Sequence, residues 1–243
     1  RLLSEYPEIV VKSACLDQVI TEEQPINNYV EKFSKILEQY QDEEYSKLFL
    51  LNVNKVISKE TKLSNSKNNL PLSRKVALTL FRMMRYKDEY EVARLHTSGE
   101  FAKSFFNENK NIKLEYYLAP PLFSKKDPET GHLIKQRFGP WIFQAFRILS
   151  SLKFLRKTKF DIFGYTTERK KERALLKKTI NTINKISDNL SENNYEKIID
   201  FLDIPLSIKG YGHVKEKNMI IAEDKWDKTL DKIFVQKDFK KVS

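Results

Sequence analysis

The sequence contains very little cysteine and histidine. Cys15 is the lone cysteine among 243 residues, so the chain can form no internal disulfide and cannot supply the roughly four thiolates of an iron–sulfur cluster. A single thiol fits a reducing compartment, and we expect a cytoplasmic location. The three histidines, His96, His132 and His213, are too far apart for the usual spacing of metal ligands. These shortages argue against a metal or redox centre held by this chain alone.

Long apolar runs are also missing. No run approaches the ~20 residues that span a bilayer, and the start of the chain shows no signal peptide. The chain begins with Arg1 rather than Met, so we expect it to be a segment of a longer protein. With 40% apolar residues over 243 positions, it is long enough to bury a substantial core.

Positive charge is in excess, and it is concentrated in the middle of the chain. Residues 1–60 carry −4, residues 61–119 carry +5, residues 120–180 carry +10, and residues 181–243 are neutral, which gives the total of +11. A basic stretch can attract nucleic acid, an anionic cofactor or an acidic protein, or it can be a solvated surface. Because no helix-turn-helix, RNA-recognition or zinc-finger pattern is present, a nucleic-acid-binding module is the alternative hypothesis rather than the first.

Apolar residues recur mostly at helical spacing, so we predict a mainly α fold. The predicted helices lie within 1–60, broken near Pro25, and at 71–98, 100–110, 141–155, 167–190, 192–203 and 213–233. Two inward stripes are especially regular: Val76, Leu80, Met83 and Met84, and Met219, Ala222, Trp226, Leu230 and Ile233. Residues 61–70 are polar and lack periodicity, which predicts a linker.

Local signals predict several helix ends. Pro71 suits the first turn of a helix. Thr166 or Thr167 is expected to cap one helix and Ser191 the next, because their hydroxyls can accept from the free N–H groups of a first turn. Pro205 is expected to end the helix that Ser191 begins.

The period changes from helical to two near the centre of the chain. Apolar residues alternate in "IKLEYYLA" (112–119) and again in "LIKQRFG" (133–139), and "KKDPETGH" (125–132) between them has turn composition. We predict a β-hairpin at about 112–138, inserted in the helical protein. Trp141, which follows it, is expected to be a packing anchor at a helix start.

Six phrases occur in an order and at a spacing that resemble one family. They are "YQDEEY" (40–45), "RYKDEYEVARLH" (85–96), "LAPPLFSKKDPETG" (118–131), "RFGPW" (137–141), "DIFGYTTERKKERAL" (161–175) and "IKGYGHVKEKN" (208–218). Together they resemble the C-terminal region of the large, fused indolepyruvate ferredoxin oxidoreductases, over about residues 15–236.

The resemblance implies a parent enzyme that oxidatively decarboxylates 2-oxoacids, aryl pyruvates included, forms an acyl-CoA and passes electrons to ferredoxin. Its implied cofactors are thiamine diphosphate, Mg²⁺ and a [4Fe-4S] cluster, with CoA as co-substrate. This chain has no "GDG" with a spaced Asn pair for magnesium and diphosphate, so we expect these groups in other parts of the parent. The parent is expected to be a homo-oligomer.

The same resemblance implies a division of the chain. Residues 1–20 are expected to be the tail of the preceding oxidoreductase domain, and residues 21–243 an accessory helical domain without catalytic residues. This domain would pack against the catalytic domains of the same parent chain. It would support assembly, or the docking of CoA or ferredoxin.

"GYGHVKEKN" (210–218) is one candidate binding site. Gly210 and Gly212 before a helix can present N–H groups to a phosphate of CoA, with His213 and Lys215 beside them. Alternatively, the glycines only take backbone angles closed to other residues, and His213 is a cap or an interior group.

Arginines provide the other candidates. Arg169 and Arg173 lie one helical turn apart and can clamp a carboxylate or phosphate, or they can form a solvated basic face. Arg137 lies close in sequence to Trp141 and offers a cation beside an aromatic ring. The acidic ferredoxins of the family would meet a basic surface, for which residues 125–178 are the candidate; alternatively, these residues face another subunit.

"RYKDEYEVARLH" contains many charges within a short span. It includes Asp88, Glu89 and Glu91, and two carboxylates this close together could serve acid–base chemistry if buried. We predict instead a structural network, in which Glu91 and Arg94 pair three residues apart on a helix.

Overall fold

The computed structural model describes residues 24–64, 70–97, 115–118, 125, 128, 134, 136–210 and 212–235. The chain divides into two compact units. The insert unit contains Lys87–Arg169, and it interrupts the sequence of the helical unit, which contains Ile20–Tyr86 and Lys170–Ser243. Each unit has its own apolar core.

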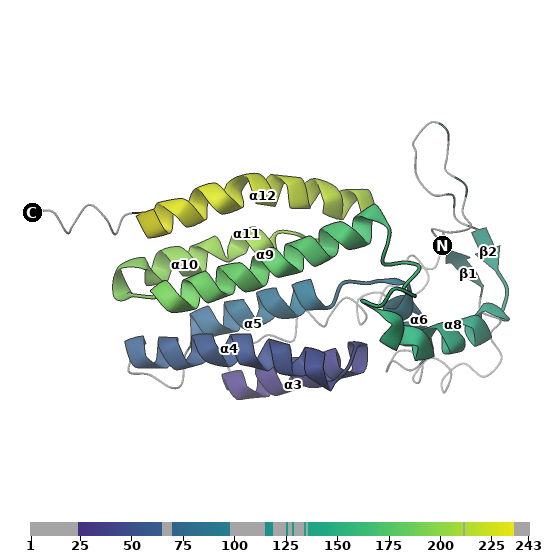
Figure 1. Ribbon diagram of the computed structural model, residues 1–243, viewed down its shortest axis with the longest axis horizontal. Coiled ribbons are helices and arrows are strands. Elements are labelled where there is room, and N and C mark those ends of the chain that lie inside the picture. Colours follow the sequence, from purple (N-terminus) through teal and green to yellow (C-terminus); the bar gives the residue numbers. More distant parts are fainter. Residues whose placement is uncertain are drawn as a thin grey trace, which may run out of the picture. The chain divides into compact units, whose positions relative to one another are not determined.

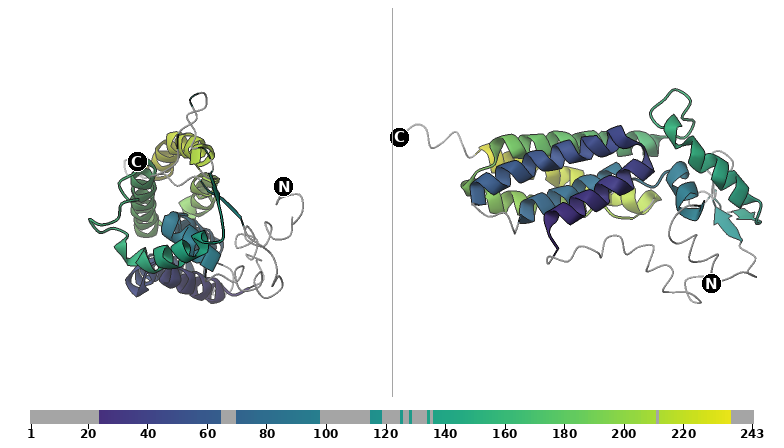
Figure 2. Two further views of the ribbon diagram at one scale, coloured as in Figure 1. Left: turned by 90° about the vertical axis from the view of Figure 1, so that its right-hand side faces the viewer. Right: turned by 90° about the horizontal axis from the view of Figure 1, so that it is seen from below.

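The helical unit consists mainly of long helices that lie side by side (Figures 1 and 2). Its elements are α3 (Ile26–Tyr40), α4 (Glu43–Ser64), α5 (Pro71–Met84), most of α9 (Thr167–Asn189), the 3-10 helix η3 (Glu192–Asn194), α10 (Tyr195–Phe201), α11 (Asp203–Leu206) and α12 (Gly212–Val235). Helices α3, α4 and α5 pack on one another, and α10 contacts α5, α11 and α12.

The predicted apolar stripes of α5 and α12 are confirmed. All of their members are buried in one core: Val76, Leu80, Met83, Met84, Met219, Ala222, Trp226, Leu230 and Ile233. The Trp226 indole is fully enclosed, and its Nε1–H donates to Thr182 Oγ1 at 3.1 Å. A buried indole therefore keeps its one polar group satisfied at the contact between α9 and α12.

The predicted continuous helix over 71–98 is wrong, because the chain leaves the helical conformation between Met84 and Glu89. Helix α5 ends at Met84, whose carbonyl accepts from the Tyr45 hydroxyl at 2.9 Å. Helix α6 (Glu89–Thr97) then begins under a cap, since Asp88 Oδ1 accepts from the Glu91 N–H at 2.8 Å. The apolar period runs on across this break, so periodicity alone could not detect it.

Other predicted ends are partly confirmed. Thr166 caps α9, its Oγ1 accepting from the Arg169 N–H at 3.3 Å, and Ser191 forms a capping box with Asn194. Pro205 does not end α10; it lies inside the short helix α11, where first-turn residues need no N–H partner. The start of the predicted linker is helical, because α4 continues to Ser64.

The insert unit contains α6, a β-hairpin, α8 (Ile142–Ser151) and the 3-10 helix η2 (Leu152–Leu155). Strands β1 (Tyr116–Leu118) and β2 (Gln136–Phe138) pair antiparallel, with Tyr117 opposite Arg137. The prediction of a mainly helical protein with one inserted hairpin is confirmed. Residues 112–114 of the predicted hairpin and the predicted helix at 100–110 lie outside the described residues.

The core of the insert unit is small and aromatic. It consists of Ala93, Tyr116, Ile142 and Phe146, with the His96 ring stacked on Phe146 at 5.4 Å. Trp141 is not the expected anchor, since 62% of it is exposed and its ring meets Phe138 only edge-on at 5.8 Å. Among the described residues, no helix combines the length and apolar character that crossing a membrane requires.

Candidate functional site

A buried ion pair lies within the insert unit. Arg156 Nε and Nη2 donate to Asp88 Oδ2 and Oδ1 at 2.6 and 2.8 Å, and both side chains are almost wholly enclosed. The guanidinium also lies over the Tyr90 ring, 5.3 Å from its centre. Two-point contact fixes the orientation of both groups, so this pair can tie residues 152–166, between α8 and α9, to the start of α6.

A second buried carboxylate lies beside the same tyrosine. The Tyr90 hydroxyl donates to Asp161 Oδ1 at 3.2 Å, and the same oxygen accepts from the Gly164 N–H at 3.1 Å. Burial first, and then the Asp161 carboxylate, raise the pKa of Tyr90, so its phenol stays protonated and keeps donating. A Cβ on Gly164 would lie 2.4 Å from Asp161 Oδ2, so only glycine fits this approach.

Glu89 is the least well paired carboxylate of the cluster. Its Oε1 accepts from Arg169 Nη2 at a long 3.5 Å, and its buried Oε2 has no hydrogen-bond partner among the described residues. Burial raises the pKa of Glu89, and the Arg169 guanidinium offsets only part of that effect. The predicted pair of Glu91 and Arg94 is confirmed, with two contacts at 2.8 and 2.9 Å.

We expect Glu89→Gln to change how stability depends on pH. Because the folded state holds the Glu89 proton more tightly than the unfolded state, this group favours folding below its ordinary pKa, and that contribution is lost as pH rises through the raised pKa. Urea unfolding gives the free energy of unfolding of wild type and of Glu89→Gln at each pH. The wild-type value minus the variant value should fall as pH rises from the ordinary pKa of a glutamate through the raised pKa of Glu89. Glu168→Gln, at an exposed partner of Arg169, is the control, and a difference independent of pH would contradict the interpretation.

The glycine turn at 210 is explained by backbone geometry. Gly210 has a φ of +102°, and a Cβ there would lie 2.9 Å from Val214 Cγ1. Gly212 is the first residue of α12, and the side chain of His213 lies outside the described part of the structure. The turn thus needs glycine at 210 whether or not an anion binds.

Lys215 is engaged by a carboxylate in this structure. Its Nζ donates to both oxygens of Glu172, at 2.6 and 2.8 Å, and the Glu172 side chain is 5% exposed. A phosphate at the turn would have to compete with this pair. The structure therefore brings Lys215 together with Glu172, the residue beside Arg173 in sequence.

The predicted arginines make separate interactions. Arg169 contacts Glu89 in the cluster, whereas Arg137 Nη2 pairs with Glu115 on the hairpin at 2.5 Å. Arg173 is half-buried on α9, one turn beyond Arg169. The two α9 arginines therefore differ in surroundings, because Arg169 is nearly enclosed beside a carboxylate.

A row of ion pairs connects α9 to α12. Lys171, Lys178 and Lys185, seven residues apart on α9, pair in turn with Glu216, Asp227 and Asp231 on α12. The residue numbers increase in the same order on both helices, so α9 and α12 run parallel. Part of the basic excess of residues 120–180 is therefore balanced inside the helical unit.

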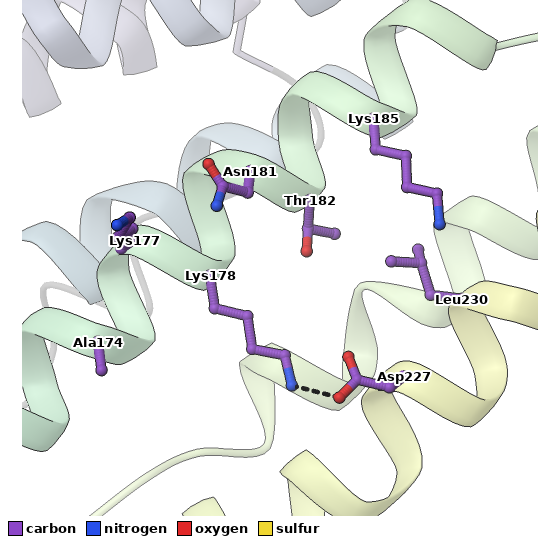
Figure 3. A pocket seen from close by; sticks show the side chains of 8 residues that line it. All are labelled: Ala174, Lys177, Lys178, Asn181, Thr182, Lys185, Asp227 and Leu230. Carbon is purple, nitrogen blue, oxygen red and sulfur yellow. Dashed lines mark hydrogen bonds and ion pairs between the residues drawn. The ribbon is translucent and has the colours of Figure 1, made fainter.

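An open hollow of about 410 Å³ lies over this row, between α9 and α12 (Figure 3). Lys178 crosses it to Asp227 at 2.9 Å, and Lys185 extends toward α12 beside Leu230 (Figure 3). Half of its lining residues are charged, namely Lys177, Lys178, Lys185 and Asp227, and Lys178 is already paired with Asp227 across it. We assign it no ligand.

The described residues contain no group of three or more His, Cys, Asp or Glu side chains placed to hold a metal ion. His96 is half-buried among aromatic rings, and burial lowers its pKa, so it is neutral near pH 7. Within the described residues we therefore place no metal ion.

Comparison with known proteins gives one family. A family model described as a family of unknown function (DUF6537) matches residues 26–228. The chain belongs to this family. No curated protein and no solved structure matches the chain. The matched range covers most of both units, so the DUF6537 region includes the buried cluster as well as the helical core.

Sequence reasoning missed two central members of the cluster, Arg156 and Asp161. Their partners, Asp88 and Tyr90, are 68 and 71 residues away in sequence, so no local spacing joins them. One available signal was the D-x-x-E pattern of Asp88 and Glu91, which is typical of a helix start. That pattern would have predicted the break before α6.

Proposed function

We propose that this DUF6537 chain is an accessory domain of a thiamine-diphosphate-dependent 2-oxoacid:ferredoxin oxidoreductase in the cytoplasm. Six ordered phrases resembling the C-terminal region of the fused indolepyruvate enzymes support the parent. The domain packs against the catalytic domains of the same parent and supports its assembly and the docking of CoA or ferredoxin. The parent is a homo-oligomer.

The pairing of buried charges within the chain is the observation that favours a scaffolding role. The two phrases richest in charge, at 85–96 and 161–175, supply Asp88, Glu91 and Asp161, and each accepts from groups of the same chain. A catalytic acid or base must reach a substrate, whereas a carboxylate held by two-point contacts is committed to structure. The buried cluster therefore stabilises the fold of the insert unit.

The cofactors would be held by other parts of the parent. Thiamine diphosphate would supply the carbanion chemistry, with Mg²⁺ holding its diphosphate and a [4Fe-4S] cluster carrying electrons. The turn at Gly210 does not fit a CoA phosphate well, because Lys215 donates a hydrogen bond to Glu172 instead. We route no reaction step through this chain.

The test is an activity assay on the natural full-length protein. Purified anaerobically, it should reduce a viologen dye when given indole-3-pyruvate and CoA, and should lose this activity without thiamine diphosphate. Absence of any 2-oxoacid-dependent reduction would contradict the proposal. Salt-sensitive retention of the same protein on DNA would instead support the nucleic-acid-binding alternative.

A further inference from the structure

Within residues 152–166, two charged side chains are buried while four large apolar side chains are exposed. Arg156 and Asp161 are 4% and 7% exposed. Four large apolar side chains of the same segment are more than half exposed: Phe154 62%, Phe160 76%, Ile162 56% and Tyr165 59%. This reverses the usual distribution of residues, in which charges are rarely buried. Exposed apolar groups gathered in one segment are typical of an interaction site.

Hydrogen bonds hold the segment in one shape. Consecutive turns close between Thr158 N–H and the Leu155 carbonyl at 2.9 Å and between Gly164 N–H and the Asp161 carbonyl at 3.1 Å. The Tyr165 hydroxyl donates to the Lys159 carbonyl at 3.0 Å, which fixes that ring against the segment. With Arg156 and Asp161 anchored below, the exposed side chains are displayed from a preorganised backbone.

The charge of the segment selects among partners. It contains four basic residues and one acidic residue, for a formal charge of +3. Lys171 and Lys178 on α9, which follow the segment, pair with acids of α12 in the helical unit, whereas Lys157 and Lys159 are exposed on the insert unit. A complementary surface is therefore acidic around an apolar centre.

We infer that residues 152–166 dock onto an acidic protein surface with apolar depressions that receive Phe154, Phe160 and Ile162. A fixed display of side chains serves a partner of fixed shape, and a fluid bilayer has none. Aliphatic Ile162 offers no flat face for a nucleobase, and the +3 charge would neutralise few phosphates. A second copy of the chain would bring like charges together.

This inference specifies the partner contact of the proposed accessory domain, but it needs only the geometry of the insert unit. An experiment can therefore contradict the docking surface without contradicting the proposed function, and the reverse. The contact can exist in a protein that has no 2-oxoacid activity, and an active oxidoreductase can use another face.

Site-specific photocrosslinking in the organism that makes the full-length protein tests the inference. Benzoylphenylalanine is placed at Phe160 or, as the control, at Leu51 on α4, which is also exposed. We expect one protein to be captured at position 160 and not at 51, with its attachment point among Asp and Glu residues. Lys159→Glu should reduce the yield at least fivefold, and Lys59→Glu on α4 should leave it unchanged. Unchanged thermal unfolding of each variant serves as the folding control.

Each result decides the inference. Capture of lipid, nucleic acid or residues 152–166 of a second copy would overturn it, as would equal yields at positions 160 and 51 or a yield insensitive to Lys159→Glu. Capture of a ferredoxin, or of a 2-oxoacid oxidoreductase domain, would support both proposals. Capture of another acidic protein, with the same charge dependence, would support this surface, while the proposed function is decided by the viologen assay alone.

Discussion

Replacing Arg156 by Met should destabilise the protein by about 3–5 kcal/mol. The substitution leaves the Asp88 carboxylate buried and without the guanidinium that donates to both of its oxygens. It also removes the cation above the Tyr90 ring. An unpaired charge in a water-poor interior costs far more than the ion pair itself contributes, which is why a single removal has so large an effect. Urea unfolding of wild type and variant at pH 7 measures the difference.

A double-mutant cycle also needs the substitution of Asp88 and the substitution of both residues together. Asp88→Asn should cost a similar amount, because it leaves Arg156 buried beside an uncharged amide. The double variant Asp88→Asn, Arg156→Gln, which can retain a hydrogen bond, should cost clearly less than the sum of the two single changes, by roughly 0.5–3 kcal/mol. Lys228→Ala, at an exposed pair with Asp224, should change stability little. Additive effects of the two single changes would show that the pair is not coupled.

Glu60→Ala is the second substitution with a large expected effect. Glu60 is fully buried on α4, and its two oxygens accept from four donors: Leu72 N–H at 3.0 Å, Ser73 N–H at 2.7 Å, Ser73 Oγ–H at 2.5 Å and the Tyr195 hydroxyl at 2.6 Å. Two of these are free N–H groups of the first turn of α5, so Glu60 caps that helix from another helix.

Alanine at this position would leave several buried donors unsatisfied, each costing ~1–3 kcal/mol. We expect a total loss of at least about 3 kcal/mol, measured as a shift in the urea midpoint at unchanged slope. Glu60→Gln retains the size and one acceptor oxygen, so it should lose less. A Glu60→Ala variant within about 0.5 kcal/mol of wild type would contradict this role, because exposed sites show changes of that size.

Local patterns predicted most of the helical unit. The stripes of α5 and α12 could be identified because each helix buries one face against a single core, which imposes the 3.6-residue period on the sequence. Thr166 and Ser191 could be predicted as caps because a cap acts within three residues.

The buried polar contacts could not be predicted in the same way. Glu60 contacts Ser73, which is 13 residues away in sequence, and Tyr195, which is 135 residues away. Arg156 contacts Asp88, which is 68 residues away. Such pairs depend on the packing of whole elements, and their members look like surface residues in the sequence. For the same reason the sequence leaves a phosphate beside Lys215 open as one alternative, although the fold places Glu172 beside this lysine.

The exposed apolar residues of 152–166 illustrate the opposite difficulty. In sequence, Phe154 and Phe160 resemble core residues, and Arg156 and Asp161 resemble surface residues, but the structure reverses both. Inversions of this kind are expected where a segment serves an interface rather than its own core.

The most direct test of the scaffolding role uses the full-length protein with both Asp88→Asn and Arg156→Gln. Its reduction of a viologen, dependent on a 2-oxoacid and CoA, is measured. If the cluster is structural, the double variant, once shown to fold and assemble like wild type, should turn over within about twofold of it, since no charge of the pair takes part in chemistry. Loss of turnover in a variant with native stability and assembly would contradict the account, because it would place Asp88 or Arg156 in the reaction itself.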